Sequence, residues 1–478
     1  MNYMKKIIYL CLIFFITNAA SSNDELTNIS NTQKLFLDFL DSAEVNYDFI
    51  PSQNNQNVNL KNISFYENGS LITVENIEFI NLNKIFDNPS SDSLNKYKGN
   101  LFDKIKLKNL KTPNASLEYF EISNVDIKDI DQLATISLDN ITDFLYDIRI
   151  DKIYFKNILL YDDTFEGSFS FKIEDINKFK YGSWIISDLD YLNRLNQSSF
   201  FVETIMFKNY QIDKKVIENL ISLFQGNPLD EDVSKYLFES KVDLFRINNF
   251  NYTSLENDIE IKFTNMDSVT DEYPEKGTFK FSDIYINKIR NKNLIYEEVL
   301  KKRNSNNLYD FVWNYNWNIS KQKIRNELKL TSKNLFELIF DISISNYSIN
   351  DYVNYYYQSE EFFKNLGKLK LNNLMFYYDD DGLIKTAYEI LEREQSGSVE
   401  DSLILLKNQF LNDEYIKSII NENQLEQIDE VFDFLLKPRN IKINIKPNPE
   451  LSFTQMQNDF INPQLLVEKL NIEIISNK

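Results

Sequence analysis

Apolar and polar residues alternate along much of this chain, and the alternation shifts by one position at a recurring asparagine. The pattern is apolar, any, apolar, any, Asn, apolar, usually any, apolar. Apolar residues two positions apart form one face of a β-strand. Full copies are Val58–Phe65, Ile72–Phe79, Phe120–Ile127, Ile153–Leu160, Ile205–Ile212, Phe245–Tyr252, Ile342–Ile349 and Leu369–Phe376, and the first half recurs in Ile105–Leu110, Ile136–Ile141 and Ile261–Met266.

The recurring asparagine marks the point where the apolar residues would otherwise move to the opposite face of the strand. A strand that shifts by one position and stays paired needs one extra residue, which is a β-bulge. Asn adopts the unusual backbone angles more readily than most residues. The pattern therefore predicts an internal repeat with bulges at Asn62, Asn76, Asn124 and Asn157, and chance placement of an abundant residue is the alternative.

The repeat and its spacing predict successive antiparallel strands. Asn68-Gly69 separates the first two copies and favours a tight hairpin turn. The clearest single strand is Tyr309–Ile319, whose aromatic residues alternate with Asp and Asn. We expect this aromatic face to be buried core, and a surface that stacks on sugars or lines a lipid groove is the alternative.

Helical patterns occupy the rest of the chain. A stripe at Leu35–Ala43 precedes the first strand, another at Val216–Phe224 ends at Gly226, and from Asn350 onward helices dominate. Two late strands are expected at Ile441–Ile445 and around Ile472 and Ile474. The later helices are expected at Tyr352–Leu366, Leu383–Leu391, Leu403–Phe410 with Ser398 and Asp401 as a capping-box start, Tyr415–Ile420 and Leu425–Leu436 before Lys437-Pro438.

These elements predict an α+β fold, a predominantly antiparallel β-sheet of bulged hairpin repeats with a helical C-terminal part. The predicted divisions are a signal peptide at residues 1–20, an N-terminal β-repeat domain at 21–200, a second β-repeat region with a helical insert at 201–349, and a helix-rich region closing with strands at 350–478.

The first 20 residues have the parts of a secretory signal. Lys5 and Lys6 precede the apolar run Ile7–Ile16, and small residues follow around Ala19 and Ala20. Ten apolar residues span only ~15 Å of helix, against a hydrocarbon core of ~30 Å, so we expect cleavage and no stable transmembrane anchor. Cleavage is expected between Ala20 and Asn23, and the mature protein is expected in the periplasm or cell envelope.

Composition limits the chemistry. The chain has no His, and its one Cys, Cys11, lies in the expected signal peptide, so neither a disulfide nor the usual transition-metal ligands are expected. The formal charge is -20, and removing Lys5 and Lys6 makes it -22. Such a charge disfavours binding to nucleic acid and to anionic membranes. We expect no cofactor and no metal.

Short motifs give no catalytic site. Asp379-Asp380-Asp381-Gly382 fails as a calcium loop, because Tyr377 and Tyr388 take ligand positions, and it is interpreted as a turn with a helix-capping Asp. The Ser93/Lys96 and Ser320/Lys323 spacings lack the accompanying motifs of penicillin-recognising enzymes. The glycines are too far apart for a phosphate-binding loop. Among 72 acidic residues, no carboxylate pair is singled out for glycoside hydrolysis.

The signal peptide, the slipping strands and the strand pair Trp313–Leu330 together resemble uncharacterised periplasmic proteins of the YdgA-like and AsmA-like kind. The segment Leu435–Phe453 and the following NPQLLVEKLNIEI are similar to the C-terminal part of alphaproteobacterial hypothetical proteins. The AsmA-like resemblance implies a role in envelope integrity and lipid movement. Such relatives usually keep an N-terminal anchor, which this chain is expected to lack.

We therefore expect an exported, non-enzymatic envelope protein that binds a lipid or another apolar ligand on a curved β-sheet. The alternative is a structural or scaffolding envelope protein with a filled core and no small ligand, and a carboxylate hydrolase is a distant third. The sequence assigns no catalytic, cofactor or metal residues. Ligand identity, protein partners and oligomeric state are not readable from it.

Overall fold

The computed structural model describes residues 45–52, 54, 57–67, 69–81, 99–127, 146–212, 214, 215, 218, 241–272, 275–288, 294–348, 351, 365–395, 397–419 and 421–477, together with residues 37, 40 and 41. These residues form an antiparallel sheet of 19 strands with helices mostly in the C-terminal part, which confirms the predicted α+β class. The expected signal peptide lies outside the described residues, as do most of the helical stripes at Leu35–Ala43, Val216–Phe224 and Tyr352–Leu366.

The chain divides into two compact units, Met1–Phe245 (unit 1) and Arg246–Lys478 (unit 2). The predicted domain boundaries after residues 200 and 349 stay predictions. No helix within the described ranges is both long enough and apolar enough to span a bilayer.

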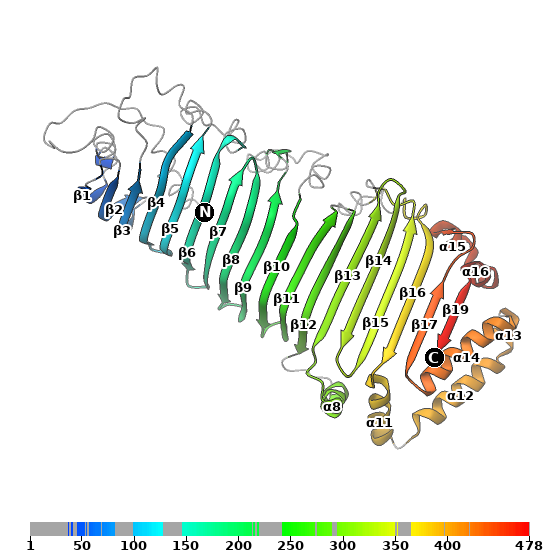
Figure 1. The fold of residues 1–478 in the computed structure, drawn as a ribbon. Helices are drawn as coiled ribbons and strands as arrows, with labels where there is room; N and C mark the ends of the chain where they lie inside the picture. The colour runs from blue at the N-terminus through cyan, green and yellow to red at the C-terminus, as the bar shows by residue number, and fades with distance from the viewer. Residues whose placement is uncertain are drawn as a thin grey trace. The chain divides into compact units, whose positions relative to one another are not determined.

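In unit 1 the strands pair in the order in which they follow along the chain (Figure 1). Glu67 pairs with Ser70 around Gly69, whose φ is +77°, as expected for the predicted hairpin. The strands are β1 Asn46–Ile50, β2 Val58–Glu67, β3 Ser70–Ile80, β4 Gly99–Thr112, β5 Ala115–Ile127, β6 Arg149–Tyr161, β7 Phe165–Asn177, β8 Lys180–Asn193, β9 Ser198–Gln211 and the first residues of β10 Leu244–Ser254.

Unit 2 contains the rest of β10 and continues with β11 Ile259–Glu272, β12 Lys276–Lys288, β13 Tyr309–Asn318, β14 Lys323–Ser332, β15 Phe336–Ser345 and β16 Lys370–Asp380. Neighbours from β11 to β16 pair in chain order. β16 then pairs with β17 Asn440–Ile445 and with the short β18 Leu451–Ser452, and β17 pairs with β19 Ile472–Ser476. The late strands around Ile441 and Ile474 are thus confirmed.

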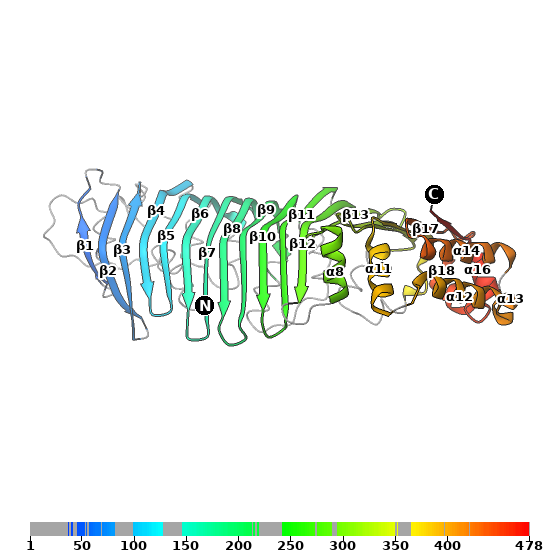
Figure 2. The ribbon, with the colours of Figure 1, turned by 90° about the horizontal axis from the view of Figure 1, so that it is seen from below.

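The helices of unit 2 are α8 Leu294–Arg303, α11 Leu383–Gln395, α12 Val399–Asn412, α13 Glu414–Ile419, α14 Glu422–Leu436, α15 Phe453–Asp459 and α16 Pro463–Leu470. α8 and α11 lie side by side on one side of the sheet (Figure 2), where Val299, Leu300, Leu335 and Ile390 form a small core. The Ser398 side chain accepts from the Asp401 amide and begins α12, as predicted. The sequence reading did not identify α8, α15 or α16.

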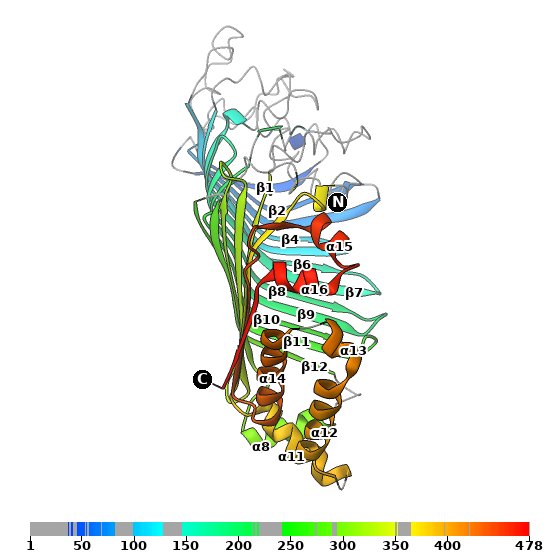
Figure 3. The same cartoon turned by 90° about the vertical axis from the view of Figure 1, so that its right-hand side faces the viewer.

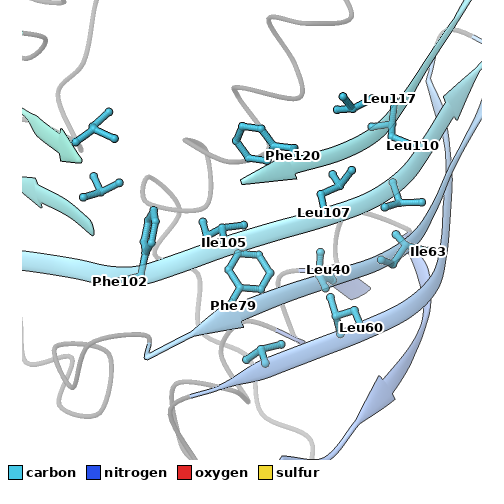
Figure 4. Packing of buried hydrophobic residues seen from close by; sticks show 14 of the residues in the cluster. Leu40, Leu60, Ile63, Phe79, Phe102, Ile105, Leu107, Leu110, Leu117 and Phe120 are labelled. Carbon is cyan, nitrogen blue, oxygen red and sulfur yellow. The ribbon is translucent and has the colours of Figure 1, made fainter. Parts of the chain in front are cut away.

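The main core lies in unit 1 and contains buried residues from β2 to β7. Leu40, from the segment before β1, packs with Leu60, Leu107 and Phe120 in this cluster (Figure 4). Leu60 is 1% exposed and Leu107 is 5% exposed, so this part of the sheet face is closed to solvent.

Candidate ligand-binding face

Two straight rows of apolar side chains cross the sheet of unit 1 from β2 to β9. Every neighbouring pair in each row is a direct cross-strand pair, so all these side chains lie on one face. The first row is Leu60, Ile77, Leu107, Phe120, Phe155, Phe171, Ile186 and Ile205, and the second is Val58, Phe79, Ile105, Ile122, Ile153, Ile173, Trp184 and Phe207.

The rows change from covered to half-exposed as they cross the sheet. At the β2 end, Val58 and Leu60 are fully buried. At the β9 end, Phe155, Phe171 and Trp184 only flank the core and remain partly accessible. The apolar face therefore continues beyond the buried cluster, whose last row member is Ile173 in β7.

A continuous series of aromatic rings runs from the buried Phe120 across the partly buried region, and we call this series the aromatic ladder. Ring centroids lie 4.7 Å apart for Phe120 and Phe155, 6.3 Å for Phe155 and Phe171, and 5.6 Å for Phe171 and Trp184. The last two steps, Trp184 to Phe207 and Phe207 to Phe245, measure 6.1 Å and 4.8 Å. The ladder consists of Phe120, Phe155, Phe171, Trp184, Phe207 and Phe245.

The recurring asparagines explain why such long strands keep their apolar side chains on one face. Asn62 has a φ of +49° and lies opposite Glu75, and the strand pairing skips both residues. Leu60 and Ile63, on either side of the interruption, are both buried. The left-handed Asn62 and the skipped Glu75 opposite it thus shift the apolar phase of both strands by one position, while β2 and β3 stay in register.

The left-handed asparagines of unit 1 donate their side-chain amides to carboxylates on a neighbouring strand or just before one. Nδ2 of Asn124 donates to Asp151 at 2.8 Å, and Nδ2 of Asn62 donates to Asp48 at 2.7 Å. All the asparagines involved have positive φ. The pairs are Asn62 and Asp48, Asn81 and Asp103, Asn109 and Glu75, Asn124 and Asp151, Asn157 and Glu118, and Asn209 and Asp243.

Regular pairing is broken at Asn62, Asn124 and Asn157, as predicted, and the prediction is wrong at Asn76. A register shift accompanies the break at Asn62 against β1 and at Asn157 against β7, but none occurs at Asn124. Asn76 pairs regularly with Lys61 on one side and with Lys108 on the other. The interruption in β3 falls instead on Glu75, because Glu75 lies opposite the left-handed Asn62 and Asn109 of the two flanking strands.

Aspartate takes the place of the left-handed asparagine in three strands, and the repeat as defined with Asn alone did not predict these positions. Asp175, Asp188 and Asp283 have φ values of +56°, +53° and +53° within β7, β8 and β12. Each follows two alternating apolar residues and precedes a third, as the repeat requires. Asp tolerates the left-handed region for the same reason as Asn, so allowing either residue in the pattern would have found them.

Three polar groups lie within or beside the aromatic ladder. Nε1 of Trp184 is buried and has no hydrogen-bond partner among the described residues. Tyr181 and Tyr210 pack against the Trp184 ring, and burial raises the pKa of both phenols. At neutral pH this part of the face therefore carries no charge from these groups and offers one unused N–H donor.

The opposite face of the same strands is polar and charged. Lys152 and Lys104 lie 3.0 Å and 3.6 Å from the carboxylate of Glu121, which also accepts from the hydroxyls of Tyr119 and Ser123. Burial by itself would raise the pKa of Glu121, but the hydrogen bonds from Tyr119 and Lys152 and the nearby lysine charges lower it to about 2. The two faces thus differ sharply in chemistry.

Unit 2 has a second aromatic cluster, and it corrects one expectation. Phe263 lies 4.8 Å from Phe250 and 5.5 Å from Phe281, again measured between ring centroids. The strand at Tyr309 is confirmed as β13, but its aromatic face is not uniformly core, because Trp313 is 37% exposed while Trp317 is 3% exposed.

The covering of β13 explains this difference. The Tyr296 hydroxyl of α8 contacts the Tyr309 hydroxyl at one end of the strand, and Tyr347 packs on Trp317 at the other end. Trp313 lies between these covered ends, and its Nε1 donates to Asn326 at 3.0 Å. The middle of the strand is therefore accessible.

The remaining sequence candidates do not assemble into a site. The Asp380 carboxylate accepts from the Ile384 amide at 2.8 Å, which confirms the predicted helix cap. Ser320 lies in the turn after β13 and bonds Asn318. Ser93 and Lys96 lie outside the described residues.

A family model described as "Uncharacterized protein" matches residues 329–477. This match covers less than half of the chain and carries no functional description. A search of curated proteins finds no match. The resemblance to YdgA-like and AsmA-like proteins therefore stays a prediction.

Proposed function

We propose that the protein is an exported, non-catalytic envelope protein that binds an apolar chain, such as the acyl chain of a lipid, along the aromatic ladder. One observation carries this proposal: the apolar rows continue to β9, and although Ile173 is buried, their aromatic members Phe155, Phe171 and Trp184 are only partly buried. Exposed contiguous apolar surface is unfavourable in water and commonly marks a binding site.

The dimensions of the ladder suit an acyl chain. It crosses six strands at a spacing of ~4.8 Å, which gives a row of about 24 Å. An acyl chain in one leaflet occupies about half of a ~30 Å hydrocarbon core, so the ladder is long enough to contact such a chain along its whole length. The buried N–H of Trp184 would donate a hydrogen bond to a ligand carbonyl.

Two variants of one strand test the proposal. Phe155 belongs to the ladder, and the adjacent Tyr154 packs with Tyr119 on the opposite face. Full-length protein purified gently and analysed by native mass spectrometry should carry stoichiometric lipid. Phe155→Ser should lose most of this lipid, and Tyr154→Ser should retain it.

Ligand uptake by the purified protein provides a second readout. With Trp313 and Trp317 replaced by Phe, Trp184 is the sole indole, and its emission should shift when oleate is added. Protein that carries no lipid and takes up neither oleate nor phospholipid would contradict the proposal. That result would favour the alternative of a scaffold, which the filled core around Val58 and Leu60 supports.

Export is part of the proposal and has its own test. The motive is the segment from Lys5 to Ala20 in the sequence. Intact-mass measurement of protein from the envelope fraction should show a chain that begins between Ala20 and Asn23. A mass that retains Cys11 would show that the segment is kept.

A further inference from the structure

β19 is the last strand of the sheet in unit 2, and its inner side pairs with β17. The Asn477 amide, just past β19, donates to the Asn440 carbonyl at 2.8 Å and therefore points toward β17. Amides alternate in direction along a strand, so those of Ile474 and Ser476 point away from β17. Such outward amides normally form an edge on which another strand can pair.

Side chains of α14 occupy this edge, and α14 lies beside β19 (Figure 3). Oε1 of Gln427 accepts from the Ile474 amide, and Oε2 of Glu430 accepts from the Ser476 amide at 2.7 Å. The same Glu430 oxygen also accepts from the Ser476 hydroxyl at 2.7 Å. By the same alternation the Ile472 amide also points outward, so α14 satisfies two of the three outward donors of β19.

We propose that α14 blocks this edge and thereby prevents a second copy of the chain from adding to the sheet through β19. The sequence Ile472-Glu473-Ile474-Ile475-Ser476 is short, rich in β-branched residues and carries one charge. Strands of this type pair readily when their edge is free. Antiparallel pairing of β19 with its own copy is a two-fold arrangement, which is the commonest form of self-association.

Removing the two acceptors tests the proposal in the full-length protein. In Gln427→Ala/Glu430→Ala, sedimentation velocity should show a dimer that increases with protein concentration and exceeds any dimer of the wild type. At low concentration, hydrogen exchange at the Ile474 and Ser476 amides should be faster than in the wild type.

A matched control lies on the same helix. Asn423→Ala/Glu426→Ala also removes one amide and one carboxylate, but from exposed positions of α14, and it should leave both measurements unchanged. Adding Ile474→Pro to the first variant removes an outward amide that is not part of the ladder with β17, and it should abolish the new dimer.

Three results would overturn the proposal. Unchanged exchange at Ile474 and Ser476 would show that α14 does not protect the edge. Faster hydrogen exchange without a dimer would show that α14 protects the edge but that a second copy of the chain does not pair with it. A dimer that survives Ile474→Pro would form elsewhere on the molecule.

Discussion

The repeated asparagines adopt a left-handed backbone conformation and also donate a hydrogen bond to a carboxylate, and substitutions of Asn124 measure the contribution of each. Asn124 has a φ of +49° and donates its amide to Asp151 at 2.8 Å. Asn124→Ala loses a hydrogen bond to a charged group, worth ~1.5–3 kcal/mol. It also places an alanine in the left-handed region, at a cost of ~1–2 kcal/mol. We expect the free energy of unfolding of unit 1 to fall by about 2.5–5 kcal/mol.

Two further variants divide this loss. Asn124→Gly loses the same hydrogen bond but tolerates the backbone conformation, so it should cost less than Asn124→Ala. Asn76→Ala changes the same position of the repeat where pairing is regular and where the Asn76 side-chain oxygen is buried without a partner. We expect that change to cost less than ~1 kcal/mol, because it removes an unsatisfied polar atom.

Urea denaturation followed by the fluorescence of a single tryptophan reports on unit 1 alone. The chain has three tryptophans, and replacing Trp313 and Trp317 by Phe leaves Trp184 in β8. All variants are compared in this background. If Asn124→Ala and Asn76→Ala lowered stability equally, the left-handed bridge to Asp151 would have no special role, and the reasoning would be wrong.

Three other substitutions test the charged face of unit 1, the core of unit 2 and an exposed control position. Glu121→Gln should lower the stability of unit 1 at pH 7 by about 3 kcal/mol, since the pKa falls from 4.5 to about 2 on folding. The lowered pKa means that this stabilisation is present above pH 4.5 and is lost as the pH falls toward 2, so urea midpoints of the variant and the wild type should converge in acid. Leu335→Ala removes a side chain that is 0% exposed and should lower the free energy of unfolding of unit 2 by ~2–5 kcal/mol. Urea denaturation monitored by the fluorescence of Trp313 and Trp317, in protein with Trp184→Phe, measures this loss. Leu405→Ala, at a position 60% exposed, should cost less than ~0.5 kcal/mol.

Local periodicity was enough to predict many of the strands and three of the four named breaks in pairing, but it did not predict β7, β8 and β12, whose left-handed residue is an aspartate. The one-position shift at Asn62 or Asn124 is a property of a single strand, so it is visible in sequence. Whether an asparagine takes the left-handed conformation also depends on the strand beside it, and Asn76 shows this, because Glu75 takes the interruption instead. The pairing partner of each carboxylate likewise required knowledge of the register.

Coverage of the aromatic face was not predictable from the strand itself. Trp313 and Trp317 occupy equivalent positions in one alternating run, yet only Trp317 is buried. The difference comes from Tyr347, whose ring packs on Trp317 and whose carbonyl accepts from the Trp317 indole, and Tyr347 lies outside the strand. The aromatic ladder was missed for a similar reason, because its members come from six strands and meet only through cross-strand pairing.

The chain-order pairing of unit 1 has a consequence for how the protein folds. From β1 to β9, each strand pairs with the one that precedes it, so sheet contacts join segments that are near in sequence. Local contacts favour rapid folding, and a sheet of this kind can grow one hairpin at a time from its first strands. During such growth the newest strand always presents a free edge, and partly built sheets are then prone to aggregate. In unit 2, the edge of the last strand, β19, is protected where Gln427 and Glu430 accept from the Ile474 and Ser476 amides.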